Sequence, residues 1–401
     1  MLLSNFQFFF LLSPTASKLS AAVATDYRAN AEAALGALQR WYNPDTGLWN
    51  STGWWNSANC LTTIGHLAAV DEHVRSSAEK VFSNTLVQAQ KYNLQQTKII
   101  TADFNMQTFE GPDTPAGQLQ AAAVINPEGF LNGYYDDEGW WALGWIQAFD
   151  VTGNQDYLKT AVTIFDDMRN GTEPICGGGI WWDKKQTYVN AIANELHLSV
   201  ASHLANRLPE QKQMYLDIAT EQWNWFLQTG MINDNDTIND GLDDQCNNNN
   251  GTLWSYNQGV ILGALVELDK ASPPNATSPY MEKANAIAKA AIDALSTDGV
   301  LHDPCEPNCG GDGNQFKGIF MRNLQLLQSA SPDNAYLDFI ASNAVSVWNK
   351  DRSAGKENQL SVDWDGPFVS SANASTQSSA LDALVAATAF QGPLRDGIAS
   401  G

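Results

Sequence analysis

Apolar residues recur at three- and four-residue spacing along most of this chain, which is the pattern of amphipathic helices. Tyr157, Ala161, Ile164, Phe165 and Met168, for example, fall on one face of such a helix. The pattern predicts twelve helices, over 24–41, 57–70, 73–92, 136–151, 155–169, 188–206, 209–229, 254–270, 277–296, 315–329, 333–349 and 375–390.

The connections between these helices alternate in length. Those after even-numbered helices are short, near 71–72, 152–154, 207–208, 271–276 and 330–332. Those after odd-numbered helices are long, at 42–56, 93–135, 170–187, 230–253, 297–314 and 350–374. Long loops without secondary structure are uncommon in compact domains unless they are functional.

A helical hairpin repeated around an axis would gather every long loop at one end. We therefore predict an all-α fold, an (α/α)6 barrel of helical hairpins with the even-numbered helices inside and an active-site groove at the long-loop end. An open superhelix of hairpins is the alternative, but it would expose a terminal apolar face that needs a cap.

The two ends of the chain suggest an exported protein. A short apolar run from Leu2 to Leu12, followed by Ala22-Val23-Ala24, is typical of a signal peptide. We predict a signal peptide over 1–24 and one domain over 25–401. The run is too short to span a membrane, and the end near Gln391 lacks the hydrophobic tail of a lipid-anchor signal. We expect a secreted monomer, extracellular or associated with the cell wall.

The composition narrows the classes of molecule that this protein can bind. The formal net charge of −22 disfavours nucleic acids and anionic membranes and is compatible with neutral sugars. The chain also holds 14 tryptophans, several of them among Gly and Asn rather than in apolar runs. They either fill the core or stack on sugar rings. N-glycosylation sequons support export, and they begin at Asn50, Asn170, Asn235, Asn250, Asn275 and Asn373.

Four of the 5 cysteines can pair in three ways in an oxidising compartment. We predict a disulfide between Cys305 and Cys309, which can close a small loop. We also predict one between Cys176 and Cys246, which both precede motif-bearing segments in long loops. Cys60 is the expected buried free thiol. A zinc site is the alternative, but it lacks a C-x-x-C pattern or a nearby His pair, so we expect no metal and no cofactor.

The long loops place aromatic residues beside amides and carboxylates, as a carbohydrate groove requires. Asn and Asp in surface loops also serve turn formation, and helical Asn or Tyr can serve hydrogen bonding in the core. A Lys near a helix start, such as Lys317, is often simply solvated. With these alternatives open, the candidate substrate contacts are Trp55, Asn56, Asp103, Tyr135, Trp140, Trp181, Asn194, Asp240, Tyr256 and Lys317.

Asp136, Asp137 and Glu138 begin a helix that the loop alternation places in the inner ring. Acids in a first helical turn often cap free N–H groups and suit the helix dipole. Here the helix would open into the mouth, and the flanking residues Tyr134 and Trp140 are aromatic. A catalytic role is therefore the competing interpretation.

Glycoside hydrolysis needs two carboxyl groups beside the scissile bond. They stand about 5–5.5 Å apart in retaining enzymes and about 6.5–9.5 Å apart in inverting ones. Adjacent aspartates at a helix start can reach the shorter separation, and such closeness separates their pKa values and roles. The pair Asp136 and Asp137 therefore favours retention.

Several motifs in series resemble glycoside hydrolase family 76. They are Tyr135-Asp136-Asp137-Glu138-Gly139-Trp140-Trp141-Ala142-Leu143, Cys176-Gly177-Gly178-Gly179-Ile180-Trp181-Trp182, Asn190-Ala191-Ile192-Ala193-Asn194-Glu195-Leu196, Trp254-Ser255-Tyr256-Asn257-Gln258-Gly259 and Phe316-Lys317-Gly318-Ile319-Phe320-Met321-Arg322. The resemblance implies an (α/α)6 barrel and retaining, endo-acting cleavage of α-1,6-mannan. By motif position it implies that Asp136 is the nucleophile and Asp137 the acid/base.

Three functions follow from these observations. The first is a secreted retaining endo-α-1,6-mannanase acting on α-mannan or another mannose-containing polysaccharide. The second, implied by the fungal relatives in the same family, is a transglycosidase that transfers mannan or mannose-bearing anchors to cell-wall glucan. The third is a non-catalytic mannan-binding wall protein, which the intact acid pair disfavours.

Overall fold

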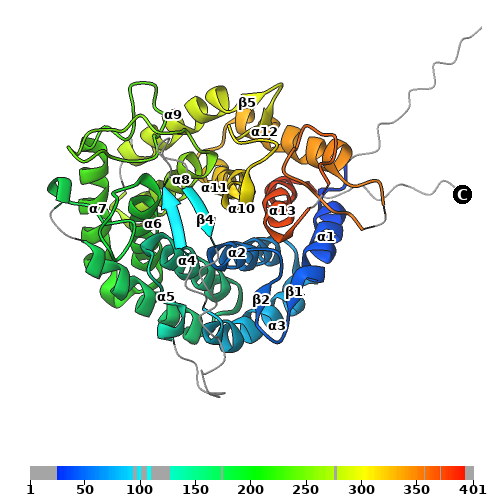
Figure 1. Ribbon diagram of the computed structural model, residues 1–401, viewed down its shortest axis with the longest axis horizontal. Coiled ribbons are helices and arrows are strands. Elements are labelled where there is room, and N and C mark those ends of the chain that lie inside the picture. Colours follow the sequence, from blue (N-terminus) through cyan, green and yellow to red (C-terminus); the bar gives the residue numbers. More distant parts are fainter. Residues whose placement is uncertain are drawn as a thin grey trace, which may run out of the picture.

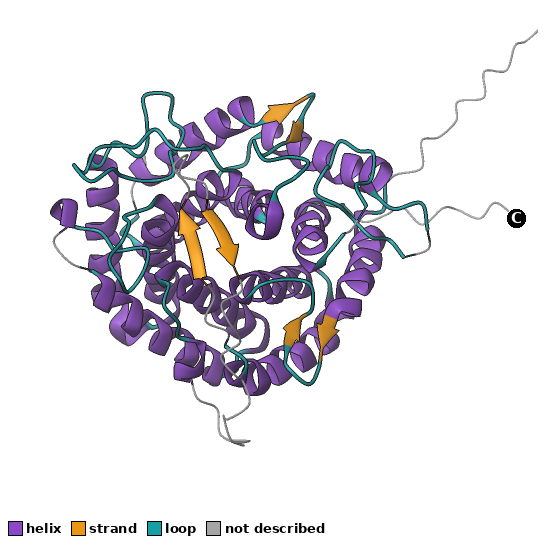
Figure 2. Ribbon diagram, viewed as in Figure 1, coloured by secondary structure: helices purple, strands orange, loops and turns teal. Residues whose placement is uncertain are grey.

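The computed structural model describes residues 25–93, 97–100, 106–109, 127–172, 175–274, 278–355, 357–370 and 372–392. Helices dominate these residues and form two concentric rings (Figures 1 and 2). The outer ring consists of α1 (Tyr27–Leu38), α3 (Glu72–Gln88), α5 (Gln155–Met168), α7 (Lys212–Gln228), α9 (Pro279–Ala294) and α12 (Asn334–Ser346). The inner ring consists of α2 (Trp54–Val70), α4 (Tyr135–Thr152), α6 (Ala191–Arg207), α8 (Ser255–Ala271), α11 (Phe316–Ala330) and α13 (Ala374–Ala389).

The inner ring is closed. Each inner helix packs on the next along the chain, and α13 packs back on α2. Helices of this ring are buried on nearly every face, whereas the outer helices bury one face only. The predicted (α/α)6 barrel is confirmed, and the open superhelix is excluded.

Small residues let the inner helices approach closely. A Cβ atom at Gly259 of α8 would lie 2.5 Å from Cα of Phe320 on α11. One at Gly318 of α11 would lie 2.5 Å from Cα of Ser379 on α13. Real side chains do not fit at such distances, so glycine sets the spacing of three neighbouring helices.

Capping residues end the short connections. Asp71, Asn154 and Asp333 each accept a hydrogen bond from a backbone N–H in the first turn of the outer helix that follows. Such N-caps satisfy donors that the helix itself leaves free. The inner and outer helices of each hairpin are therefore joined by only a few residues at this end of the barrel.

The long loops meet at the opposite end, around the N-termini of the inner helices. Neighbouring loops are joined by backbone bridges or hydrogen bonds, namely Tyr134 with Asp183, Asn190 with Gly241, Ser255 with Asp303, Lys317 with Val362, and Ser51 with Ala374. The predicted clustering of the long loops is thus observed in the parts of them that the structure describes. We call this end the mouth.

The loops also hold elements that helical periodicity did not predict. Three antiparallel strand pairs are present among the described residues: β1 (Tyr42–Asn43) with β2 (Leu48–Trp49), β3 (Thr97–Ile100) with β4 (Met106–Phe109), and β5 (Ser296–Thr297) with β6 (Val300–Leu301). A short helix, α10 (Gly310–Gly313), precedes α11. None of the helices in the described ranges is both long and apolar enough to cross a bilayer.

The cysteines pair as the sequence predicted. Cys176 is bonded to Cys246, and Cys305 is bonded to Cys309. Cys60 is free and buried on α2. Both disulfides lie in mouth loops, where they hold long connections that have little regular secondary structure of their own.

Candidate active site

Asp136 and Asp137 lie in the first turn of α4, at the mouth. Both are buried, with 2% and 0% of their surface exposed. Tyr134 occupies the N-cap position and makes no side-chain cap. Oδ1 of Asp136 accepts the N–H of Asp137 at 2.9 Å, so the capping interpretation holds for that one oxygen.

Oδ2 of each aspartate is held by a different mouth loop. Nε1 of Trp182 donates to Oδ2 of Asp136 at 3.1 Å. Nδ2 of Asn132 donates to Oδ2 of Asp137 at 2.6 Å. Helix capping does not require either contact. The two carboxyl groups are therefore oriented separately, and Trp182 and Asn132 are site residues that the sequence did not single out.

Glu138 serves as an anchor behind the pair. Its Oε1 accepts the N–H of Asn132 at 3.1 Å and lies 2.8 Å from Nζ of Lys184. Lys184 also lies 2.6 Å from Oδ2 of Asp167. Burial raises the pKa of Glu138 to about 8, against the lowering effect of the Lys184 ammonium. Glu138 thus ties together the two loops that orient Asp137 and Asp136.

A second polar group comes from α8 and from the loops that precede α6 and α8. The hydroxyl of Tyr188 donates to Oδ2 of Asp240 at 2.8 Å, and Nδ2 of Asn249 donates to that hydroxyl at 2.8 Å. Burial raises the pKa of Asp240 to about 7. Burial, and then the charges of Asp240 and Asp136, raise the pKa of Tyr256. Asp136, Asp240 and Tyr256 therefore share one polar centre.

An aromatic layer underlies this centre. The Tyr256 ring stacks on Phe316 with centroids 3.9 Å apart, and Trp55 stacks on Trp140 at 5.5 Å. Nε1 of Trp55 donates to Oδ1 of Asp312 at 2.7 Å. Trp55 and Trp140 are buried, with 1% and 2% exposure. These two tryptophans thus form a fixed base to the site, as the core-filling interpretation expects.

Other sequence-predicted contacts are used for internal support. Nδ2 of Asn56 donates to Oε1 of Gln315 at 2.9 Å. Nδ2 of Asn194 donates to the carbonyl of Ile180 at 3.0 Å, and its Oδ1 accepts the N–H of the same residue at 2.8 Å. These bonds match the alternative of core hydrogen bonding, and a sugar contact by Asn56 or Asn194 stays a prediction.

Lys317 is also bound within the protein. Its Nζ lies 2.8 Å from Oε1 of Glu306 and 2.7 Å from the carbonyl oxygen of Val362, and it sits over the Trp364 ring at 4.4 Å. It is buried with 2% exposure, which excludes the solvated state considered as its alternative. Its role here is to join two mouth loops.

The remaining predicted contacts differ in their setting. Tyr135 is buried, and its N–H donates to the carbonyl of Trp182 at 2.9 Å. Trp181 is half-buried. Asp103 lies outside the described residues, as do the proposed signal peptide at 1–24 and the sequon at Asn275.

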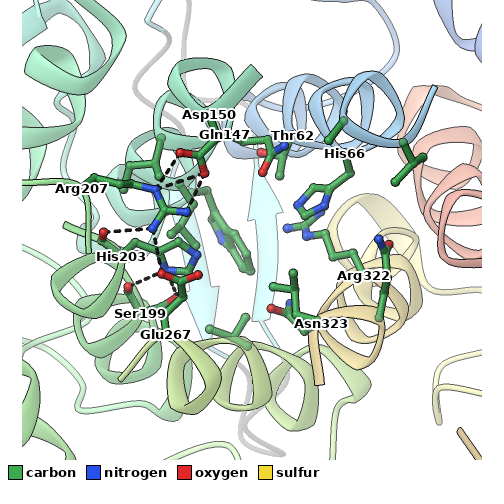
Figure 3. A pocket seen from close by; sticks show the side chains of 18 residues that line it. Thr62, His66, Gln147, Asp150, Ser199, His203, Arg207, Glu267, Arg322 and Asn323 are labelled. Carbon is green, nitrogen blue, oxygen red and sulfur yellow. Dashed lines mark hydrogen bonds and ion pairs between the residues drawn. The ribbon is translucent and has the colours of Figure 1, made fainter. Parts of the chain in front are cut away.

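A cavity of about 250 Å³ lies at the short-connection end of the barrel and is a different site from the acid pair (Figure 3). Trp140 lines it, but Asp136 and Asp137 do not. Arg207 projects into it and is paired with Asp150 at 2.6 Å and with Glu267 at 2.8 Å. The two carboxyl groups that line the cavity, those of Asp150 and Glu267, are thus both neutralised by Arg207.

Comparison with known proteins identifies the fold's relatives. The sequence profile of glycosyl hydrolase family 76 matches residues 27–396. This chain belongs to glycosyl hydrolase family 76. The match covers the whole barrel, so the resemblance inferred from the motifs is confirmed, and the acid pair, the polar centre and the aromatic base all lie within the family domain.

Individual members of family 76 are distant relatives. Mannan endo-1,6-alpha-mannosidase DFG5 of Saccharomyces cerevisiae is 26% identical over 216 residues, which cover 49% of this chain and 46% of that protein. This chain therefore matches about half the length of that relative.

Solved structures of the family share the fold. An inactive α-1,6-mannanase GH76A of Salegentibacter sp. HEL1_6, in which two consecutive aspartates are replaced by asparagine, was solved with α-1,6-mannotriose. It has a TM-score of 0.72 and 19% identity, over 90% of this chain and 99% of that one. Dfg5 of Chaetomium thermophilum, solved with glucosamine, has a TM-score of 0.73 and 16% identity, over 92% of each chain.

Proposed function

We propose that this family 76 protein is a retaining endo-α-1,6-mannosidase that acts on mannan outside the cell or in the cell wall. The observation that carries the proposal is the buried pair Asp136 and Asp137 at the mouth, with each carboxyl group held by its own loop. The names of the curated relatives support the linkage, and the inactive GH76A variant supports a role for two adjacent aspartates.

The proposed reaction is a double displacement. The Asp136 carboxylate attacks the anomeric carbon while Asp137 gives its proton to the departing glycosidic oxygen, so that a covalent mannosyl ester forms and the glycosidic bond breaks. Asp137, now a carboxylate, then takes a proton from water, which attacks the anomeric carbon and releases Asp136. Each displacement inverts the configuration at the anomeric carbon, so the two steps together retain it.

The surroundings suit these roles. The N-terminus of α4 carries partial positive charge, which favours the anionic nucleophile. The Trp182 indole orients Asp136 without giving up a proton. Asp240 and Tyr256 belong to the same polar centre as Asp136 and offer hydrogen-bonding groups for sugar hydroxyls.

Product sizing after incubation with linear α-1,6-mannan tests this function. We expect the wild type to release short mannooligosaccharides and both Asp136→Asn and Asp137→Asn to release none. Asp303→Asn is a matched control, because Asp303 is a buried mouth acid that caps α8 through Ser255 at 2.8 and 2.7 Å. It should lower stability but keep cleavage.

A parallel incubation with acceptor oligosaccharides separates hydrolysis from transfer. Both reactions pass through the same mannosyl ester and differ only in whether water or a sugar hydroxyl attacks it. Acceptor molecules that have gained mannosyl residues would identify a transglycosidase. Cleavage of mannan at the wild-type rate by both aspartate variants would overturn the proposed function.

A further inference from the structure

A second cluster of ionisable groups lies on the outer face of the barrel, far from the mouth. It joins Glu32 of α1 to Asp71 and His73 at the short α2–α3 connection. Nδ1 of His73 lies 3.5 Å from Oε1 of Glu32 and 3.5 Å from Oδ1 of Asp71. One ligand-type atom from each of the three residues lies within 4.8 Å of the other two.

Asp71 is the fixed member of this cluster. Its side chain is only 1% exposed, and its Oδ1 caps α3 by accepting the N–H of His73 at 3.0 Å. Its Oδ2 is buried and receives no hydrogen bond from any residue that the structure describes. A buried carboxylate oxygen without a donor is costly, and a cation bound to the same carboxyl group would offset part of that cost.

The two carboxyl groups also face each other. Burial, and then the hydrogen bond and the charge of Asp71, raise the pKa of Glu32, while His73 lowers it. A divalent cation between the two carboxyl groups would offset the repulsion between them when both are ionised. The side chains of His73 and Glu32 are 78% and 41% exposed, which leaves an open path for an ion.

The distances agree with a tetrahedral metal. Zn²⁺ binds His nitrogen and carboxylate oxygen at about 2.0–2.2 Å, so two ligand atoms of a tetrahedral site stand roughly 3.3–3.6 Å apart. The two measured separations of 3.5 Å fall in this range. Ca²⁺ and Mg²⁺ prefer oxygen ligands alone, so the imidazole of His73 argues against either ion.

We propose that Glu32, Asp71 and His73 form a Zn²⁺ site with water in the fourth position. The ion would tie α1 to the start of α3. Because the three ligands converge only in the folded chain, Zn²⁺ would stabilise the native state over the unfolded one.

A similar cluster at the mouth provides an internal control. His302, Glu306 and Asp363 also bring ligand-type atoms within 4.8 Å of one another. There, however, the ammonium of Lys317 lies 2.8 Å from Oε1 of Glu306 and already supplies the cation. We therefore expect no Zn²⁺ site at this second cluster.

The test uses tag-free full-length protein that has been stripped with a chelator and kept near neutral pH. Calorimetric titration with ZnCl₂ should show saturable one-to-one binding, and thermal unfolding should shift to higher temperature. His73→Ala and Glu32→Gln should each weaken binding by about tenfold or more. His302→Ala should leave it unchanged. Titration with Co²⁺ should give the intense visible bands of a tetrahedral complex, and His73→Ala should remove them.

Three results would overturn the proposed Zn²⁺ site. They are a wild type that does not bind Zn²⁺ saturably, binding that survives in His73→Ala, and binding that is lost only in His302→Ala. The first would leave His73 as an ion-pair partner of the two carboxylates. His73 and Glu32 are exposed and lie outside the catalytic centre, so mannan cleavage by their variants should stay at the wild-type level and serves as the check on folding.

Discussion

The indole nitrogen of Trp182 lies 3.1 Å from Oδ2 of Asp136, 46 positions earlier in the chain. Asn132 makes the equivalent contact to Asp137 at 2.6 Å. Two residues that are neighbours in sequence are thus oriented by two separate loops. Carboxyl groups with different environments can take different roles in one reaction, and this separation is the basis of the mechanism proposed above.

Trp182→Phe removes the indole donor and keeps an aromatic ring. A hydrogen bond to a charged group is worth about 1.5–3 kcal/mol, so kcat/KM on mannan should fall by roughly 10- to 100-fold. Steady-state kinetics measure this change. Trp225→Phe is the matched control, because it also loses an indole bond, to the carbonyl of Cys176 at 2.9 Å, but away from the acid pair. Equal losses in the two variants would contradict the role given to Trp182.

The two aspartate variants should differ in kind when azide is added. Asp137→Asn lacks the base that activates water, but it keeps the nucleophile. With an activated mannosyl substrate, azide should therefore restore its turnover and yield a mannosyl azide. Asp136→Asn cannot form the ester and should not recover the same retained product. Rescue of Asp136→Asn with a retained product, and no rescue of Asp137→Asn, would reverse the assignment.

Much of the fold could be predicted because the relevant signals are local. Helical periodicity and alternating loop lengths gave the rings, their order and the position of the mouth. The strand pairs were missed because they are very short. β1 holds only Tyr42–Asn43, and β3 with β4 lies inside a connection without clear alternation.

The candidate site was less predictable, because its contacts join residues distant in sequence. Asp136 and Asp137 could be found from their adjacency and their aromatic flanks. Trp182 lay within a quoted motif, but nothing local showed that its N–H reaches Asp136. Lys317 is predicted to contact sugar from its type and motif position, and neither of these reveals that Glu306 and Val362 also bind it.

The buried acids predict how stability depends on pH. Burial raises the pKa of Glu138 from an ordinary value of 4.5 to about 8, so the folded protein holds a proton that the unfolded chain has released. The stabilisation is full below about pH 4.5 and is lost as pH rises through 8. Burial lowers the pKa of His66 to about 3 and that of His197 to about 4, so both stay neutral in the folded protein. Below pH 6.5 the unfolded chain binds these protons and the folded protein does not, so there the two histidines make the free energy of unfolding rise with pH.

Between about pH 6.5 and 8 the acids therefore decide the trend, and the free energy of unfolding should fall. Glu138→Gln should reduce this slope by up to about 1.4 kcal/mol per pH unit. Urea unfolding at several pH values measures it, and Glu282→Gln, at an exposed site on α9, should leave the slope unchanged. Stability that rises across this window would refute the assignment of buried, protonated acids.

The sequons should be occupied selectively if the protein is exported. Asn50, Asn170, Asn235 and Asn250 are exposed in mouth loops and should carry glycans. Asn373 should not, because its side chain caps α13 by accepting the N–H of Thr376 at 2.9 Å. Enzymatic deglycosylation in ¹⁸O-labelled water, followed by peptide mapping, reads each site. Full occupancy of Asn373 in folded protein would contradict this capped arrangement.

The central claim is that Asp136 becomes covalently attached to the sugar while Asp137 handles the proton. It is tested most directly by mass spectrometry of Asp137→Asn after incubation with a mannosyl substrate whose leaving group needs no protonation. We predict a protein heavier by one mannosyl chain, with the mass on Asp136 in the peptide map, and no such adduct on Asp136→Asn. An adduct on another residue, or an unmodified protein that releases product of inverted configuration, would contradict the account.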